Sequence, residues 1–206
     1  MASRSDKEQA ALAAAERVFT RYGFVRTTMG DIAAEAAMSR PALYLLFADK
    51  EAIFAAVIAQ MDQRAIADIR TQIALLPSRR ERLHQACGDW GSHGVALAAA
   101  YPDSADLFDL RFAAVRQAYA HFQALLVEIL GDTDATALSS PPDEIARSLT
   151  YGMRGLRETA RDVDEMRRLI RLHVDAYAWA LDAKVGGNGS VRAVSERRSG
   201  ALKPAS

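Results

Sequence analysis

The sequence has a single cysteine, Cys87, and no long apolar run. One cysteine excludes an intrachain disulfide, which fits a reducing cytoplasm, although a regulatory thiol or a bridge between subunits stays open. No apolar stretch approaches the roughly 18 residues that a membrane-spanning helix needs. The N-terminal residues also lack the apolar segment of a signal peptide. These absences predict a cytoplasmic protein with no membrane partner.

Residue patterns for catalysis or metal binding are missing as well. The four histidines do not have the spacing of metal ligands, and there is no glycine-rich phosphate loop. No Ser/His/Asp set or pair of catalytic carboxylates can be identified. We therefore expect neither an enzyme nor a bound cofactor or metal.

Signals for β-strands are also lacking, since hydrophobic residues do not alternate and no Asn-Gly turn joins β-branched runs. Alanine, leucine, arginine and glutamate dominate, and all four favour helix. The 206 residues are 50% hydrophobic, which is enough for a sizeable core. The sequence predicts an all-α fold. We expect a three-helix domain at residues 1–52, a larger helical domain at 53–184, and a disordered basic tail at 185–206.

Capping residues mark where the N-terminal helices begin. Ser5 and Glu8 could form a capping box for the first helix, and Gly23 would end it in a left-handed conformation. A second short helix is expected near Thr28, and a third after Ser39, with Pro41 in its first turn. A tight turn at residues 37–38 would join these two short helices. Three short helices with such a turn form a helix-turn-helix unit, whose last helix fits the DNA major groove.

The rest of the chain predicts longer helices. A fourth helix of about 25 residues would start after Asp49 and connect the two domains. Ser78 and Glu81 would cap the next helix, which the glycines at 91 and 94 should kink or break. Residues 101–102 would end that segment, one or two helices would fill 103–130, and a loop at 131–142 would precede two final helices.

Four short segments resemble the TetR family of bacterial transcription regulators. They are residues 19–24 (FTRYGF), 27–33 (TTMGDIA), 36–44 (AAMSRPALY) and 47–53 (FADKEAI). The resemblance covers about the first 55 residues. Ala37 stands where the family has a turn glycine, which would cost about 1 kcal/mol if the backbone is left-handed there. Leu45 and Leu46 also depart from the family pattern.

The resemblance implies that several N-terminal residues bind double-stranded operator DNA. Thr28 is expected to bind phosphate at the start of the second helix, and Lys50 to anchor phosphate at the start of the fourth. The third helix would contact bases or backbone. The complete expected set is Thr28, Ser39, Arg40, Pro41, Ala42, Tyr44 and Lys50.

The family resemblance also implies a small-molecule effector cavity in the second domain, although the same residues could be plain core. The candidates are Trp90, His93, Phe108, Arg111, Phe112, Tyr119 and Tyr151. Arg111 lies among apolar residues and is the expected polar anchor, for example for a carboxylate. Apolar stripes on the last two helices predict a homodimer through a four-helix bundle. The expected interface is Leu149, Gly152, Met153, Gly155, Leu156, Ile170, Val174, Tyr177 and Leu181.

These observations predict a dimeric DNA-binding transcription regulator. The leading hypothesis is a repressor that a small-molecule effector releases from its operator. One alternative is a member of the family that activates transcription or responds to a protein partner. A non-DNA-binding helical scaffold or enzyme is the alternative from a different class.

Overall fold

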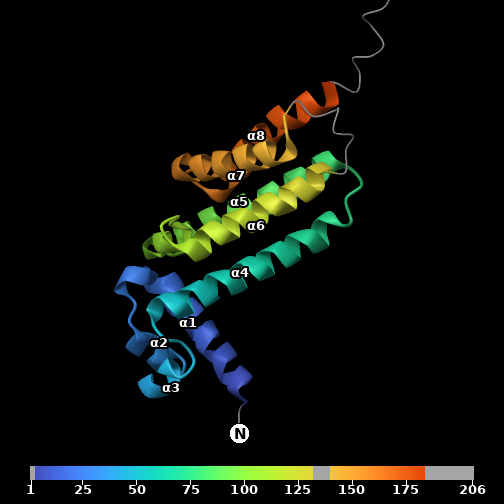
Figure 1. The fold of residues 1–206 in the computed structure, drawn as a ribbon. Helices are drawn as coiled ribbons and strands as arrows, with labels where there is room; N and C mark the ends of the chain where they lie inside the picture. The colour runs from blue at the N-terminus through green and yellow to red at the C-terminus, as the bar shows by residue number, and fades with distance from the viewer. Residues whose placement is uncertain (1–2, 132–139, 184–206) are drawn as a thin grey trace, which may run out of the picture.

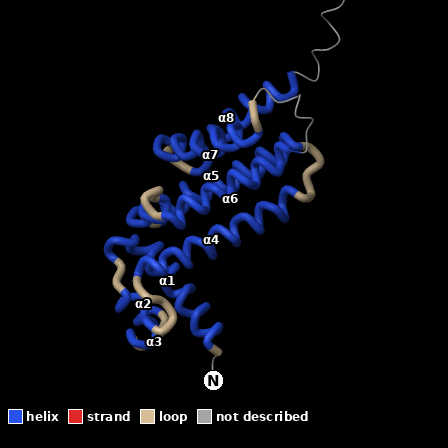
Figure 2. The backbone as a smooth tube through the Cα atoms, viewed as in Figure 1, coloured by secondary structure: helices blue, strands red, loops and turns tan. Residues whose placement is uncertain are grey.

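A computed structural model describes residues 3–131 and 140–183, and every regular element in these two ranges is helical (Figures 1 and 2). This confirms the predicted all-α class. In chain order the elements are α1 (Arg4–Arg26), α2 (Met29–Glu35), α3 (Arg40–Tyr44), α4 (Lys50–Ile73), α5 (Arg79–Ala100), the 3₁₀ helix η1 (Pro102–Phe108), α6 (Ala113–Gly131), α7 (Pro142–Thr159) and α8 (Val163–Ala183). The tail predicted at 185–206 and most of the predicted loop at 131–142 lie outside the described residues.

In the N-terminal head, α2 packs against α1, α3 packs against α2, and α1 packs against α4 (Figure 1). Phe19, Ile32 and Leu43 are fully buried there, one from each of the first three helices. Burying one large apolar side chain from each short helix supplies stability that helices of five to seven residues would lack in isolation.

The head core continues past residue 52 into α4 and the body. Phe54 on α4 lies between the rings of Phe19 and Phe24 from α1 and of Phe112, which precedes α6. The centroid distances from Phe54 are 4.7 to 5.1 Å, so the four rings form one cluster across the junction. The boundary placed at 52/53 therefore falls inside a shared core.

Helices α5, α6, α7 and α8 form the body, and α4 runs along it from the head (Figure 1). Leu83, Phe122, Leu126 and Leu149 are fully buried in its core. Among the described residues, no helix is both long and apolar enough to cross a membrane.

Most predicted helix starts are confirmed. Thr28, Ser39, Asp49 and Ser78 each cap a helix through a side-chain oxygen that accepts a backbone N–H. The first cap was wrong, because Ser3, and not Ser5, caps α1. The Ser3 hydroxyl accepts the N–H of Asp6, and the Asp6 carboxylate accepts the N–H of Ser3.

Gly23 has the positive φ that was predicted, 71°, but its ψ of 170° differs from that of a left-handed helix cap, and the chain kinks there and continues to Arg26. A Cβ atom at this position would lie only 2.4 Å from the backbone oxygen of Asp103 in η1. Glycine therefore serves both the turn and the close approach of η1 to the head.

The predicted break at residues 91–94 is wrong, since α5 runs unbroken from Arg79 to Ala100. Gly91 and Gly94 instead let other side chains approach the helix. A Cβ on Gly91 would lie 2.5 Å from the Ile170 side chain of α8, and one on Gly94 would lie 3.2 Å from Arg157 of α7. Tertiary packing thus compensates for the low helix propensity of glycine.

Candidate DNA-binding surface and effector cavity

The turn between α2 and α3 contains the strained residue that the sequence predicted. Ala37 has φ of 51° and is the only non-glycine residue with positive φ in the described ranges. The turn is closed by hydrogen bonds from Ala37 N–H to Ala34 O and from Met38 N–H to Ala33 O. This geometry sets the angle at which α3 leaves α2.

We expect Ala37→Gly to leave stability unchanged or raise the free energy of unfolding by up to about 1 kcal/mol. Glycine removes the cost of a left-handed alanine, while the more flexible unfolded chain offsets part of the gain. The matched control is Ala34→Gly, at an exposed helical position of α2, which should cost about 1 kcal/mol. Urea denaturation of both variants at one protein concentration measures the difference. Equal losses in the two variants would contradict the assigned backbone strain.

Helix α3 presents the exposed surface expected to contact DNA. Arg40, Pro41 and Tyr44 are exposed, with Tyr44 at 52%, while Ala42 is half-buried. The Ser39 hydroxyl accepts the N–H of Ala42, so this side chain is used as the helix cap. Leu43 points inward and fixes the helix against the head core.

The Arg40 side chain lies across α2. A Cβ on Gly30 would be 2.9 Å from the Arg40 Nη2 atom, so Gly30 makes room for the guanidinium. Arg40 also helps to lower the pKa of Asp31, after the larger contributions of the Thr28 hydrogen bonds. The guanidinium is therefore held at the α2–α3 face and remains exposed.

The structure argues against a phosphate contact by Thr28. Its hydroxyl donates to Asp31 Oδ2 at 2.6 Å and accepts the Asp31 N–H at 3.2 Å. Hydrogen bonds from the Thr28 side chain and backbone lower the pKa of Asp31, which keeps this carboxylate charged. A negative charge at the start of α2 would repel a phosphate at that position.

Lys50 also differs from its expected role as a phosphate anchor. Its Nζ atom donates to the carbonyl oxygens of Phe24 and Thr27, at 2.8 and 2.9 Å. It also lies 4.2 Å from the centre of the Phe24 ring. The ammonium group therefore satisfies the carbonyls at the end of α1, where a helix leaves acceptors unpaired.

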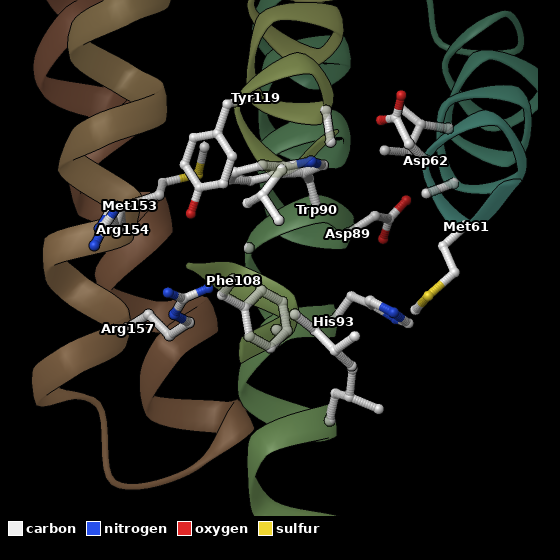
Figure 3. A pocket seen from close by; sticks show the side chains of 18 of the residues that line it. Met61, Asp62, Asp89, Trp90, His93, Phe108, Tyr119, Met153, Arg154 and Arg157 are labelled. Atoms are coloured by element: carbon white, nitrogen blue, oxygen red, sulfur yellow. The ribbon is translucent and has the colours of Figure 1, made fainter. Parts of the chain in front are cut away.

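A cavity of about 280 Å³ lies in the body between α4, α5, α7 and the start of α6 (Figure 3). Its walls are mainly apolar and include Met61, Trp90, Leu97, Phe108 and Met153. Trp90 is fixed by stacking on Phe122, with ring centroids 4.4 Å apart and an angle of 8° between the planes. The volume is close to the lower end of small-molecule sites, about 300 to 1,000 Å³.

The structure brings four of the seven expected effector residues together in this cavity: Trp90, His93, Phe108 and Tyr119. The other three do not line it. Phe112 belongs to the aromatic cluster at the head junction. Tyr151 is 41% exposed, with its ring centre 5.8 Å from that of Tyr119.

Arg111 is not the polar anchor of the cavity. Its side chain is 81% exposed and its Nη2 atom lies 2.6 Å from Asp109 Oδ2. Side-chain and backbone hydrogen bonds from Arg111 lower the pKa of Asp109, so this local ion pair holds the guanidinium at the surface. Sequence reasoning missed the guanidinium groups that do line the cavity, those of Arg154 and Arg157 on α7. Their three-residue spacing beside the buried Met153 was the available signal.

Most of the expected dimer interface is covered by its own subunit. Leu149, Met153, Ile170 and Val174 are buried in the body core. Gly152 faces α8, because a Cβ there would clash with His173. Leu156 and Tyr177 are half-buried and packed on the same core, and the side chain of Leu181 lies outside the described residues. Among the members of the expected set whose side chains the structure describes, only Gly155 is exposed with open space beside it.

The N-terminal part of the chain is similar to known regulators. Residues 11–57 match the family described as bacterial regulatory proteins, tetR family. The HTH-type transcriptional regulator EthR of Mycolicibacterium smegmatis is 31% identical over 80 residues. That alignment spans 39% of this chain and 37% of the length of EthR, so the chain matches well under half of that relative.

The whole fold is similar to solved structures of low sequence identity. The fatty acid degradation regulator FadR from Bacillus halodurans aligns with a TM-score of 0.67 and 16% identity, over 84% of this chain and 96% of that one. A transcriptional regulator of the TetR/AcrR family from Thermobifida fusca aligns with a TM-score of 0.64 and 20% identity, over 84% and 98% of the two chains. These alignments show a shared arrangement of helices over the head and the body.

Proposed function

Because the chain belongs to the TetR family of bacterial regulatory proteins, we propose that it is a homodimeric repressor that a small-molecule effector releases from operator DNA. As a member of this family it is a DNA-binding transcriptional regulator with a helix-turn-helix head, and not an enzyme. Repression, effector release and the dimer are the proposed parts. The proposal places operator contacts on the exposed face of α3 and the effector in the body cavity.

One observation carries the proposal: η1 touches both the cavity and the head. Leu107 and Phe108 at the end of η1 line the cavity. In the same helix, the Asp106 carboxylate accepts the N–H of Val25 at 3.2 Å, and Asp103 pairs with Arg26 at 2.8 Å. A ligand that displaces Phe108 would therefore shift a segment bonded to the end of α1.

Helix α4 provides a second connection, since it begins in the head and lines the cavity through Met61, Asp62 and Ile69. Two matched heads must sit about one helical turn of DNA apart, roughly 34 Å, to occupy both half-sites. An effector that prefers a different head spacing would shift the population away from the DNA-bound state. The cavity also favours a small molecule over the alternative of a protein partner.

Selection from random duplexes with the full-length chain tests the operator proposal. A homodimer should enrich an inverted repeat with half-sites about 10 base pairs apart. In vitro transcription from a promoter that carries the enriched site should then fall when the protein is added. Enrichment of no sequence would contradict operator binding, and increased transcription would support the activator alternative.

We place the dimer contact on the outer faces of α7 and α8. Exposed residues there include Tyr151 and Gly155 on α7 and Leu172 on α8, whose side chain is 68% exposed. Apolar exposure of this kind is typical of a surface that a partner covers. A stable dimer contact should bury at least about 1,200 Å² in total.

Gly155→Arg should convert the dimer to a folded monomer. Among the described residues nothing lies within 4 Å of a Cβ at this position, so the arginine fits the monomer but would project into a partner helix. Sedimentation velocity measures the mass, and circular dichroism checks the fold. Ala59→Arg, at an exposed position of α4, is the control and should remain dimeric. An intact Gly155→Arg dimer would move the interface elsewhere, and a monomeric wild type would contradict the homodimer.

A further inference from the structure

The polar groups of the cavity are divided between two sides (Figure 3). Arg154, Arg157 and the Tyr119 hydroxyl lie on the α7 side, while Asp62 and Asp89 lie on the side of α4 and α5. Building on the proposed effector function of this cavity, we propose that its ligand is a small amphipathic carboxylate. Its anionic head is bound by Arg157 and Tyr119, and its apolar body packs on Trp90 and Phe108.

Arg157 is available to bind an anion. Its guanidinium lies 4.3 Å from the centre of the Phe108 ring, and its stem packs on Gly94 of α5. These contacts hold a half-buried cation against the cavity wall. Within the described parts of the chain, no carboxylate forms an ion pair with it. A ligand carboxylate could accept two parallel N–H bonds from such a group.

Arg154 adds positive charge to the same side. Its nearest ion-pair contact is Glu158, with Nε and Oε1 3.9 Å apart, a separation too long for a hydrogen bond. It also contributes weakly to the lowered pKa of Asp109, behind the direct hydrogen bonds from Arg111. Arg154 is therefore not neutralised by a close carboxylate, and it reinforces the attraction for an anion.

Tyr119 supplies an unused hydrogen-bond donor. The residue is only 3% exposed, and its buried hydroxyl has no partner in the described structure. Its ring is fixed edge-on to Trp90, with centroids 4.9 Å apart, and its oxygen points toward the α7 side of the cavity (Figure 3). A buried hydroxyl without a partner carries a free-energy cost that a ligand oxygen would remove.

Two of the three acidic residues that line the cavity already have hydrogen-bond partners. Asp62 Oδ2 lies 2.5 Å from His121 Nδ1, and Asp89 Oδ2 accepts from the Gln85 amide at 2.9 Å. Asp68, which also lines the cavity, is exposed to water. Two carboxylates with partners and one in water attract a cation less than an unpaired, half-buried guanidinium attracts an anion. Preferential binding of an ammonium ligand would therefore contradict the proposal.

Matched ligands that differ only in their head group test this proposal. The probes are octanoate, octan-1-ol and octylammonium, together with 4-phenylbutyrate and its alcohol and ammonium counterparts. Calorimetric titration of the full-length wild-type dimer measures each Kd without DNA. In at least one series, the carboxylate should bind about 10-fold or more tightly than the alcohol, and the ammonium compound most weakly.

Variants locate the head group. Arg157→Gln should weaken the preferred carboxylate about 10-fold or more and leave the alcohol unchanged, which shows that the cavity is intact. Tyr119→Phe should weaken the carboxylate about 3- to 10-fold. The control Arg4→Gln removes an exposed guanidinium of α1, outside both the cavity and the proposed dimer face, and should change neither affinity.

Several results would overturn the carboxylate assignment: no binding in either series, tighter binding of an alcohol or ammonium compound, or an Arg157→Gln variant with unchanged preference. A separate titration of the ligand into the operator complex addresses effector release. If the carboxylate binds in a way that depends on Arg157 but the operator complex stays intact, the proposal of effector release is contradicted. The assignment of the ligand as a carboxylate still holds. The two proposals can therefore fail independently.

Discussion

Phe54→Ala should lower the free energy of unfolding by about 3 to 5 kcal/mol, as expected when a fully buried aromatic ring is removed from a core. Phe54 is 1% exposed and contacts three other rings, from both the head and the body. Its loss would leave a void between α1, α4 and the segment before α6. The head should therefore lose its fixed orientation as well as stability.

Urea denaturation followed by circular dichroism measures the loss of stability, at one protein concentration because the stability of the proposed dimer would depend on concentration. Tyr22→Ala is the control, since this aromatic side chain is 45% exposed and should cost less than about 1 kcal/mol. A loss below about 1.5 kcal/mol for Phe54→Ala would mean that the surrounding rings collapse into the space. In that case the aromatic cluster would not be what fixes the head on the body.

The helix starts could be predicted from the sequence because capping is local. A side-chain oxygen at the cap and a backbone N–H three residues later are close in any helix, whatever packs around it. Thr28, Ser39 and Ser78 illustrate this. At the N-terminus the sequence predicted a capping box of Ser5 with Glu8, whereas the structure uses Ser3 with Asp6, two residues earlier.

Interactions between distant segments were less predictable. The glycines at 91 and 94 indicated a break by local propensity, but Ile170 and Arg157 fill the space above them. Arg111 was favoured because its sequence neighbours are apolar, yet Asp109, two residues away, holds it at the surface. The positive charge beside the cavity comes from Arg154 and Arg157 on α7, more than 40 residues after Arg111. Local sequence patterns do not indicate which helix will line the cavity.

The same limit applies to residues inferred from the family resemblance. Lys50 matches the family motif, but its ammonium group binds carbonyl oxygens that lie 23 and 26 residues earlier in the chain. Arg40 matches the motif as well and remains exposed on α3. Two cations in one motif thus have different structural surroundings, and this difference predicts different effects on DNA binding.

Arg40→Ala should weaken binding to the selected operator by about 1 to 3 kcal/mol and reduce discrimination between operator variants. The expected loss follows from an exposed guanidinium at the start of α3, the helix expected to enter the major groove. Fluorescence anisotropy with the operator and with single-base variants measures both effects. A melting curve checks that the head is intact, because the guanidinium also packs on Gly30.

Lys50→Met is the contrasting variant, with nearly the same side-chain length and no charge. It should lower the free energy of unfolding by about 1 to 3 kcal/mol, because two carbonyls lose a charged donor. The slope of log Kobs against log salt concentration should not change, since each phosphate contact contributes about 0.9 to that slope. A slope reduced by about 0.9 would mean that Lys50 leaves the carbonyls and binds phosphate in the complex.

For Arg40→Ala, the contradicting result is an unchanged affinity together with an unchanged base preference. An exposed guanidinium that reads a base cannot be removed without changing one of the two, so that result would place the DNA contacts outside the start of α3.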